Sequence, residues 1–346
     1  MCNGILDPRL FGIALLCGLL LIAPGARANE DSDAVEQTTI EVTGLGAGDL
    51  PALSGEFQAL PSDASSVLNG QLQIEETDAL LLLTVEDAQE VNATAAAIGN
   101  SASMDIQDDV SLESIQEVQK GTNSRLELNA MGNSGDLTGT AAAIGNSLAL
   151  SSEGVMGASL LQGNTSEMVS STLDVVEAST TGGVTMTGAS IGNSASFDNK
   201  GPSSLAGAQQ NQADVGSSVS GVVSEAGEAV TLTAAAMANS LSGAGTGIME
   251  TATNQVNDGS LVRADLTGTL TNIGGDLSLT GAAIGNSMTL TQTGEHLALR
   301  GAARQENRAG VVSTVSMSEI SAYGKVNATA AAIGNTLSIT NKLPTP

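Results

Sequence analysis

The sequence predicts an all-β protein built as a repetitive β-solenoid. A phrase reading Ile-Gly-Asn-Ser, or a close variant, recurs six times at intervals of 46 to 49 residues. Apolar and polar residues alternate before each copy, as in a half-buried strand. A fixed period of this length means stacked units that bury their apolar faces only against a neighbour. A stacked β-sandwich made of the same strands is the alternative. The copies begin at Ile98, Ile144, Ile191, Met237, Ile284 and Ile333.

The first 28 residues are typical of a secretory signal peptide. Arg9 precedes an apolar run, and Ala26-Arg27-Ala28 forms a small-x-small cleavage site. The run is too short and wrongly flanked to span a membrane. Cys17 raises the possibility of a lipoprotein, but a leucine stands before it where a small residue is required. We therefore expect an exported protein at the cell surface, associated with the outer membrane or extracellular, with no transmembrane span in its mature chain.

The charge and the cysteines narrow the class of protein. The formal net charge is −26, and cleavage of the signal would leave it near −27. Nucleic acid is excluded as a partner because binding to phosphates requires clustered Lys and Arg. Both cysteines, Cys2 and Cys17, would leave with the signal. The mature chain must then be held by apolar burial and backbone hydrogen bonds rather than by disulfides.

Residues 29–90 do not carry the phrase, and we expect them to form an N-terminal cap or docking segment. Residues 38–43 and 80–85 have the composition of strands, and Pro51 and Pro61 between them indicate turns. A cap is needed because the end of a stack exposes unpaired strand edges. The predicted β-repeat domain spans 91–340, and 341–346 is a short tail.

Each repeat is predicted to contain a strand that changes phase. With the first residue of the phrase as position 0, positions −7 and −5 are mostly apolar and −6 and −4 are polar, as in Val184-Thr185-Met186-Thr187. Beyond a small tripeptide such as Gly188-Ala189-Ser190, positions 0, +2, +4 and +6 become the inward set. A period-2 pattern changes phase only through a bulge or corner. We expect the bend at the tripeptide, with the Gly at +1 contributing to it.

The Asn at position +2 falls on the inward face among apolar neighbours. A buried amide without partners costs about 1–3 kcal/mol, so it needs a hydrogen-bond partner close by. Stacked identical layers supply one, because equivalent amides repeat about every 4.8 Å. The sequence predicts a structural ladder of Asn100, Asn146, Asn193, Asn239, Asn286 and Asn335.

A second, looser signature follows the phrase and predicts another strand in each unit. It reads Gln162-Gly163-Asn164, Gln210-Asn211, Asn254-Gln255-Val256-Asn257 and Gln305-Glu306-Asn307, and its closest match in the first repeat, Gln119 to Asn123, is out of step. The number of layers per repeat stays open. One layer would place equivalent Asn residues about 4.8 Å apart, and two layers about 9.6 Å apart.

Catalytic, metal and cofactor sites are not predicted. His296 is the only histidine, so nucleophilic catalysis and common zinc sites lack support. Gly274-Gly275-Asp276 is only a fragment of a calcium-binding nonapeptide, which leaves weak calcium binding by loop acids open. A polysaccharide-processing enzyme on a parallel β-helix is less favoured, because paired carboxylates do not stand out. An ice-binding face of Thr-x-Thr pairs is also less favoured, because outward Thr is simply a good strand former.

The phrase Ala-Ala-Ile-Gly-Asn-Ser resembles the holdfast anchoring proteins of stalked alphaproteobacteria, the HfaD-like group. Together with the Gln-Gly-Asn segments it is also similar to curli-type repeats of bacterial surface amyloids. The resemblance covers about residues 91–340. It implies export across the outer membrane, assembly with companion secretion and anchor proteins, and tethering of adhesive polysaccharide. The longer period and the lack of regular flanking glutamines depart from curli repeats.

We therefore expect a non-enzymatic, secreted adhesion or anchoring protein that acts in a biofilm-forming holdfast. Its expected partners are outer-membrane anchor proteins and polysaccharide, with possible self-association. The alternative is a self-assembling, curli-like amyloid fibre subunit, which would use the exposed end of the stack.

Overall fold

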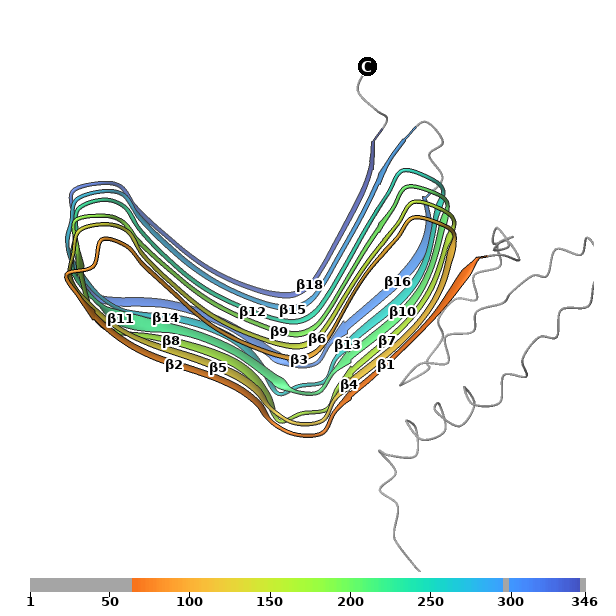
Figure 1. The fold of residues 1–346 in the computed structure, drawn as a ribbon, viewed down its shortest axis with the longest axis horizontal. Helices are drawn as coiled ribbons and strands as arrows, with labels where there is room; N and C mark the ends of the chain where they lie inside the picture. The colour runs from red at the N-terminus through yellow and green to blue at the C-terminus, as the bar shows by residue number, and fades with distance from the viewer. Residues whose placement is uncertain (1–63, 295–298, 343–346) are drawn as a thin grey trace, which may run out of the picture.

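The described part of the chain, residues 64–294 and 299–342 of a computed structural model, is a β-solenoid without helices (Figure 1). Eighteen strands form three six-stranded sheets, and every pairing between neighbours is parallel. The predicted fold class is confirmed. The signal peptide, the expected strand at 38–43 and the tail beyond 342 lie outside the described residues.

Each turn of the solenoid places one strand in each sheet. Sheet A contains β1 (Ser65–Gln73), β4 (Val110–Val118), β7 (Met156–Asn164), β10 (Ser203–Asn211), β13 (Met249–Asn257) and β16 (Leu299–Asn307). Sheet B contains β2 (Thr77–Glu86), β5 (Thr122–Asn133), β8 (Met168–Thr180), β11 (Asp214–Ala226), β14 (Leu261–Ile273) and β17 (Gly310–Ala322). Sheet C contains β3 (Val91–Ile106), β6 (Leu137–Ser152), β9 (Val184–Asn199), β12 (Val230–Gly245), β15 (Leu277–Thr293) and β18 (Val326–Lys342).

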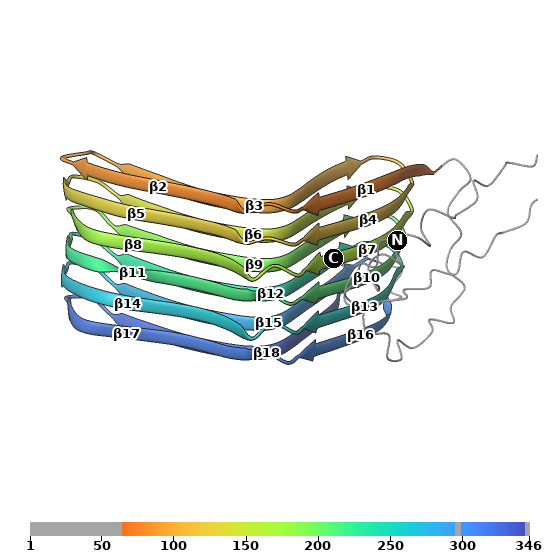
Figure 2. The same cartoon turned by 90° about the horizontal axis from the view of Figure 1, so that it is seen from below.

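One repeat makes one layer of the stack (Figure 2). In sheet C, Asn100 pairs with Asn146, and Asn146 pairs with Asn193, so copies of the phrase meet in adjacent strands. The same register continues to the last turn. Equivalent residues are therefore separated by one strand spacing, about 4.8 Å.

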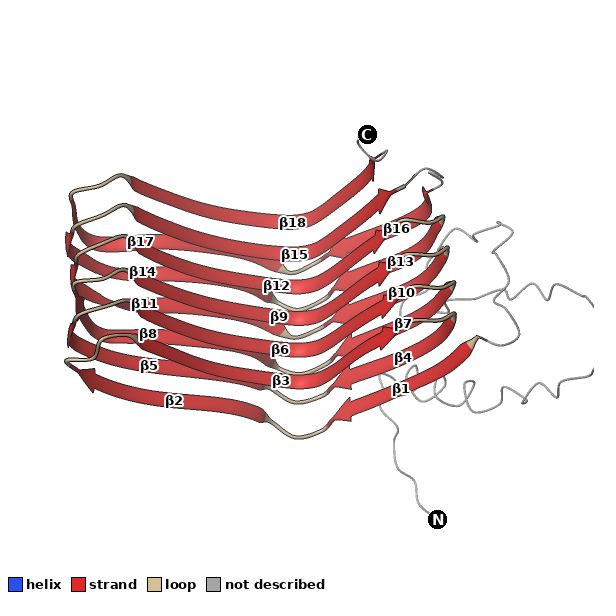
Figure 3. Ribbon diagram, turned by 45° about the horizontal axis from the view of Figure 1, so that its top comes forward, coloured by secondary structure: helices blue, strands red, loops and turns tan. Residues whose placement is uncertain are grey.

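The cross-section of the stack is a V, because the long sheet-C strands bend near their middle (Figures 1 and 3). The first half of each sheet-C strand packs on sheet B, and the second half packs on sheet A. Two large apolar cores result, with a small third cluster of Ala143, Val169 and Ala213 beside the bend. One joins residues such as Leu128 and Leu137, and the other joins residues such as Leu112 and Leu148. The cores contain Ala, Val, Leu, Ile and Met with a single Phe, consistent with closely spaced sheets.

The bend lies two residues later than the sequence predicts. In β6 the alternation of buried and part-exposed residues continues through Ala141-Ala142-Ala143, so that Ile144 faces outward. The phase changes at Gly145 and Asn146, which are both buried. The assignment of position 0 to the inward set is therefore wrong. Positions +2, +4 and +6 do face inward, as Asn146, Leu148 and Leu150 show.

The solenoid also begins earlier than the phrase. Strands β1 and β2 belong to the same sheets as the later strands, so residues 65–86 form part of the first turn rather than a separate cap. The strand expected at 80–85 is confirmed within β2. The phrase could not reveal this start, because it marks only the third strand of each turn.

Candidate functional site

The six predicted Asn residues meet in one continuous column at the bend of sheet C. In the first five turns Nδ2 donates to the Oδ1 of the Asn in the next turn at 2.7 to 2.8 Å. The second Nδ2 hydrogen of Asn146 goes to the carbonyl of Gly163 in β7 at 2.8 Å. Equivalent bonds to sheet A are made by Asn100, Asn193, Asn239 and Asn286. The column thus ties sheet C to sheet A between the two apolar cores.

A second column, made of glutamines, runs beside the first. Each Nε2 donates to a sheet-C carbonyl at 2.7 to 2.9 Å, and from the second turn onward it also donates to the Oε1 of the Gln in the preceding turn at 2.6 to 2.7 Å. Its members are Gln71, Gln116, Gln162, Gln209, Gln255 and Gln305. The first-repeat match at Gln119 to Asn123 is therefore wrong, and Gln116 holds the equivalent place. A period of 45 to 50 residues between these glutamines was the missed signal.

The two columns have opposite direction. Asn side chains donate towards the C-terminal end of the stack, whereas Gln side chains donate towards the N-terminal end. A shorter third column joins Asn211, Asn257 and Asn307 at 2.7 to 3.0 Å. This column packs against the glycines of the phrase, since a Cβ on Gly192 would lie 2.5 Å from Asn211 Oδ1. Small residues at the bend therefore leave room for the amides.

The outer surface of sheet C lines the inside of the V and is almost uncharged. Only Asp105, Asp198 and Lys342 carry charge in its six strands. Outward positions form uniform rows along the stack, with Thr at −4, Ala at −2, Ile or Met at 0, and Ser or Thr at +3. We call this surface the concave face. It presents hydroxyl groups on both sides of a central apolar row.

The charged side chains of the strands lie mostly in sheets A and B. Arg308 donates to Glu306 and to Asp258, and Arg304 also pairs with Glu306. The hydrogen bond from Arg308 lowers the pKa of Glu306, and the same bond raises the pKa of Arg308. Lys200 pairs with Glu153, and that hydrogen bond raises the pKa of the lysine. The ion pairs lie on exposed surface, so each adds little stability.

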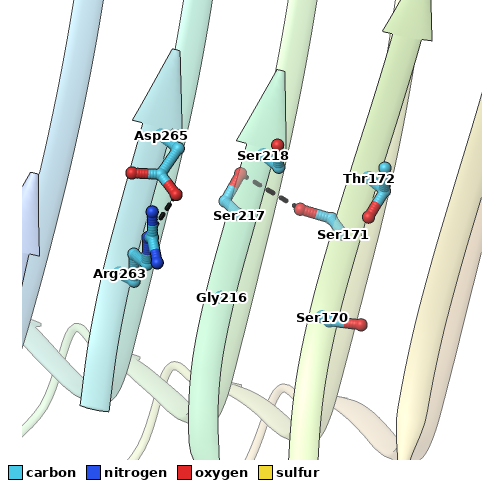
Figure 4. A pocket seen from close by; sticks show the side chains of 8 residues that line it. All are labelled: Ser170, Ser171, Thr172, Gly216, Ser217, Ser218, Arg263 and Asp265. Carbon is cyan, nitrogen blue, oxygen red and sulfur yellow. Dashed lines mark hydrogen bonds and ion pairs between the residues drawn. The ribbon is translucent and has the colours of Figure 1, made fainter. Parts of the chain in front are cut away.

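A shallow hollow interrupts the outer surface of sheet B (Figure 4). It forms because Gly216 has no side chain between Ser170 and Arg263 in the adjacent strands. Arg263 forms an ion pair with Asp265, which neutralises the cation. The hollow therefore offers mainly hydroxyl groups, and is lined by Ser170, Ser171, Thr172, Gly216, Ser217, Ser218, Arg263 and Asp265.

The described residues contain no cluster of three or more His, Cys, Asp or Glu side chains that could hold a metal ion. Asp276, from the calcium-like fragment, accepts a hydrogen bond from the backbone N–H of Lys325. His296 lies outside the described residues. Over the same described part of the chain, no helix has the length and apolar character of a membrane span.

The comparisons with known proteins add one match. A family model described as holdfast attachment protein D matches residues 85–344. The search of curated proteins and the search of solved structures each gave no match. The matched range includes β3 to β18. It therefore contains the whole Asn column and the Gln column from Gln116 onward.

Proposed function

Because the chain belongs to the holdfast attachment protein D family, we propose that it tethers adhesive polysaccharide to the outer membrane and that the concave face contacts the polysaccharide. A holdfast-related adhesion or anchoring role follows from family membership. The proposal adds the outer membrane as the place of attachment, companion secretion and anchor proteins as partners, and the surface that binds the glycan.

The observation that carries the proposal is the neutrality of the concave face in a chain of net charge −26. Rows of Thr and Ser hydroxyls can exchange hydrogen bonds with sugar hydroxyls. The central row of Ile144, Ile191 and their equivalents can pack against the C–H faces of sugar rings. Each contact is weak, but repetition along the stack multiplies them along one polymer.

The continuous pairing of the strands supports a tethering role. The concave rows lie on strands that are paired with both neighbours in the inner turns, and the amide columns cross-link sheets A and C. A binding surface on regular strands keeps its geometry better than one on loops. A tether benefits from this, because pulling on the glycan does not reshape its binding surface.

We propose that this role is non-enzymatic. Supporting this, the described acids are dispersed over the outer faces rather than gathered on the concave face. A glycosidase requires two carboxyl groups flanking one bond, at separations of about 5–10 Å on one side of a cleft. The two carboxyl groups on the described concave face, Asp105 and Asp198, lie in one row with Ser151 between them, about 9.6 Å apart, at the upper end of that range and beside the cation of Lys200.

The test places charge on the concave face without touching the cores. The double variant T140E/T233E alters outward positions in β6 and β12, which are separated by one intervening turn. A matched control, T84E/T267E, adds the same charge to outward positions of sheet B. Each protein is expressed in cells from which the gene has been deleted, and attachment under flow and binding of purified holdfast polysaccharide are measured.

We expect the deletion strain to shed its adhesive, T84E/T267E to restore attachment, and T140E/T233E to fail while keeping the melting temperature of the control. Equal restoration by both variants would refute the concave face as the contact. Normal attachment by the deletion strain would refute the tethering role itself.

A further inference from the structure

We propose that copies of this protein join end to end, with the C-terminal turn of one copy (β16, β17 and β18) pairing with the N-terminal turn of the next (β1, β2 and β3). The occupant of each end is therefore a second copy of this chain, and all three sheets continue across the junction. This self-association is independent of the proposed polysaccharide contact.

Both ends of the stack expose unpaired strand edges and core positions. Among the described strands, β1 to β3 and β16 to β18 each have a neighbour on one side only. At the C-terminal end Leu337 and Ile339 are 48% and 56% exposed, whereas the equivalent Met288 and Leu290 in the turn above are buried. Covering these side chains would remove apolar surface from water, which favours association. Unpaired edges of this kind are templates for another strand.

The amide columns make the two ends complementary. At the C-terminal end Asn335 has no following turn to receive its Nδ2, whose one contact among the described residues is a long 3.5 Å approach to the carbonyl of Gln305. At the N-terminal end, Asn100 Oδ1 has no donor from a preceding turn in the described chain. A head-to-tail junction joins these two groups.

The ends of the Gln column are also complementary, but here the free donor lies at the N-terminal end and the free acceptor at the C-terminal end. Gln71 at the N-terminal end has a spare Nε2 hydrogen, and Gln305 at the C-terminal end has an Oε1 that receives no donor from the described residues. Head-to-tail contact would therefore pair donor with acceptor in both columns. Head-to-head contact would bring like groups together, which favours one polarity of assembly.

The charges of the two end turns are also complementary. Residues 64–106 contain seven acidic residues and no Lys or Arg, whereas residues 299–341 contain four basic residues and two acidic ones. The basic residues are Arg300, Arg304, Arg308 and Lys325. The acidic N-terminal turn thus matches the most basic turn of the stack.

One specific ion pair follows from the register. The residue before each sheet-C strand lies in a column that starts at Glu90, continues through Asp136 and Asp276, and ends at Lys325. A further turn would place Glu90 of the next copy against Lys325. In sheet A, the same register sets Arg304 and Glu306 against uncharged positions, Gly70 and Leu72.

The experiment uses the purified exported protein and a charge exchange at the junction. Sedimentation velocity is measured over about a hundredfold range of concentration, since mass action must drive association. Electron microscopy then shows the shape of the assemblies. We expect linear assemblies one stack wide for the parent protein.

Each single variant, K325E or E90K, should weaken association by about three- to tenfold, in keeping with an exposed ion pair. The double variant should return towards parental association. The matched control K120E reverses an exposed charge in the second turn and should change nothing. I339K should weaken association most, since it puts a charge on an exposed core position of the end turn.

The proposal is overturned if the folded protein keeps the monomer mass at every concentration. It is also overturned if association occurs but is unaffected by I339K and by both charge reversals, because another surface is then responsible. Recovery in the double variant cannot arise from misfolding, so it supports the junction even if one single variant is unstable.

Discussion

Asn239 keeps every hydrogen bond of its column although Ala238, not glycine, precedes it. Asn239 Nδ2 donates to Val256 O at 2.9 Å and to Asn286 Oδ1 at 2.8 Å, as its equivalents do. Among the described residues, the glycines with a positive φ are Gly132 and Gly294. The glycines at the other bends therefore do not adopt this conformation. The bend therefore requires a small side chain rather than a left-handed backbone.

Substitutions at the bend should depend on size. Gly145→Val should destabilise the protein by about 2–3 kcal/mol, because a Cβ there meets Gly192 O at 2.5 Å and Asn164 Nδ2 at 2.7 Å. Ala238→Gly should change stability by less than about 1 kcal/mol. Urea unfolding followed by circular dichroism measures both. A larger cost for Ala238→Gly than for Gly145→Val would show that backbone conformation, not space, controls the bend.

Removing one inner Asn should cost more than removing the terminal one. Asn193→Ala deletes two donated bonds and leaves Asn239 Oδ1 and Asn146 Nδ2 each without that partner in a buried site. We expect a loss of about 3 kcal/mol in the free energy of unfolding. The exposed Asn335→Ala, measured in the monomer, is the control and should cost less than about 1 kcal/mol. Equal losses of unfolding free energy for the two variants would mean that the bonds between Asn side chains of neighbouring turns add no stability.

A carboxylate in the Gln column should make stability depend on pH. Gln209→Glu replaces a donor to Gln162 Oε1 and to Ser240 O with an acceptor in a buried position. Burial would raise the pKa of the introduced carboxyl group above its unfolded value. The loss of stability relative to the parent should therefore be smallest below about pH 4 and grow as the pH rises. Thermal melting from acid to neutral pH measures it, with the half-buried Gln71→Glu as control.

The ion pair between Arg308 and Glu306 in the last turn should change stability with pH in the opposite direction, because its contribution decreases towards acid pH. Arg308 lowers the pKa of Glu306, mainly through its hydrogen bond, so the pair stabilises the fold above the unfolded pKa and this contribution is lost as pH falls through the folded pKa. Arg308→Gln should raise the pKa of Glu306 towards its usual value. Carbon-detected NMR titration of the Glu306 carboxyl group tests this. Arg125→Gln, in another exposed pair, should leave that titration unchanged.

The sequence was sufficient to predict the stack because its period is regular and its strands alternate. Copies of Asn146 could be assigned to one column, since residues that repeat once per layer must occupy equivalent positions. The layer count stayed open because Asn164 and its equivalents could equally have filled alternate rungs. Only the register between β3 and β6 distinguishes the two arrangements.

The bend and the second column were harder to predict for physical reasons. Ile144 has the residue type of a core position, yet it lies on the concave face, where a bent sheet partly covers its own outer side chains. Gln209 was missed because Gln210 stands directly before Asn211, although the spacing of Gln162 to Asn164 and of Gln255 to Asn257 favours Gln209. An amide column is specified by which residue faces inward, and that depends on a bend that composition does not locate.

The opposing directions of the Asn and Gln columns have a consequence for the height of the scaffold. Hydrogen-bonded amides aligned in one direction would accumulate a dipole with every added turn, as peptide units do along a helix. Here the Asn column at the bend and the Gln column beside it point in opposite senses, so their side-chain dipoles largely cancel. Duplication or loss of a repeat that carries these two columns alone would therefore lengthen or shorten the protein without a growing amide dipole at its ends.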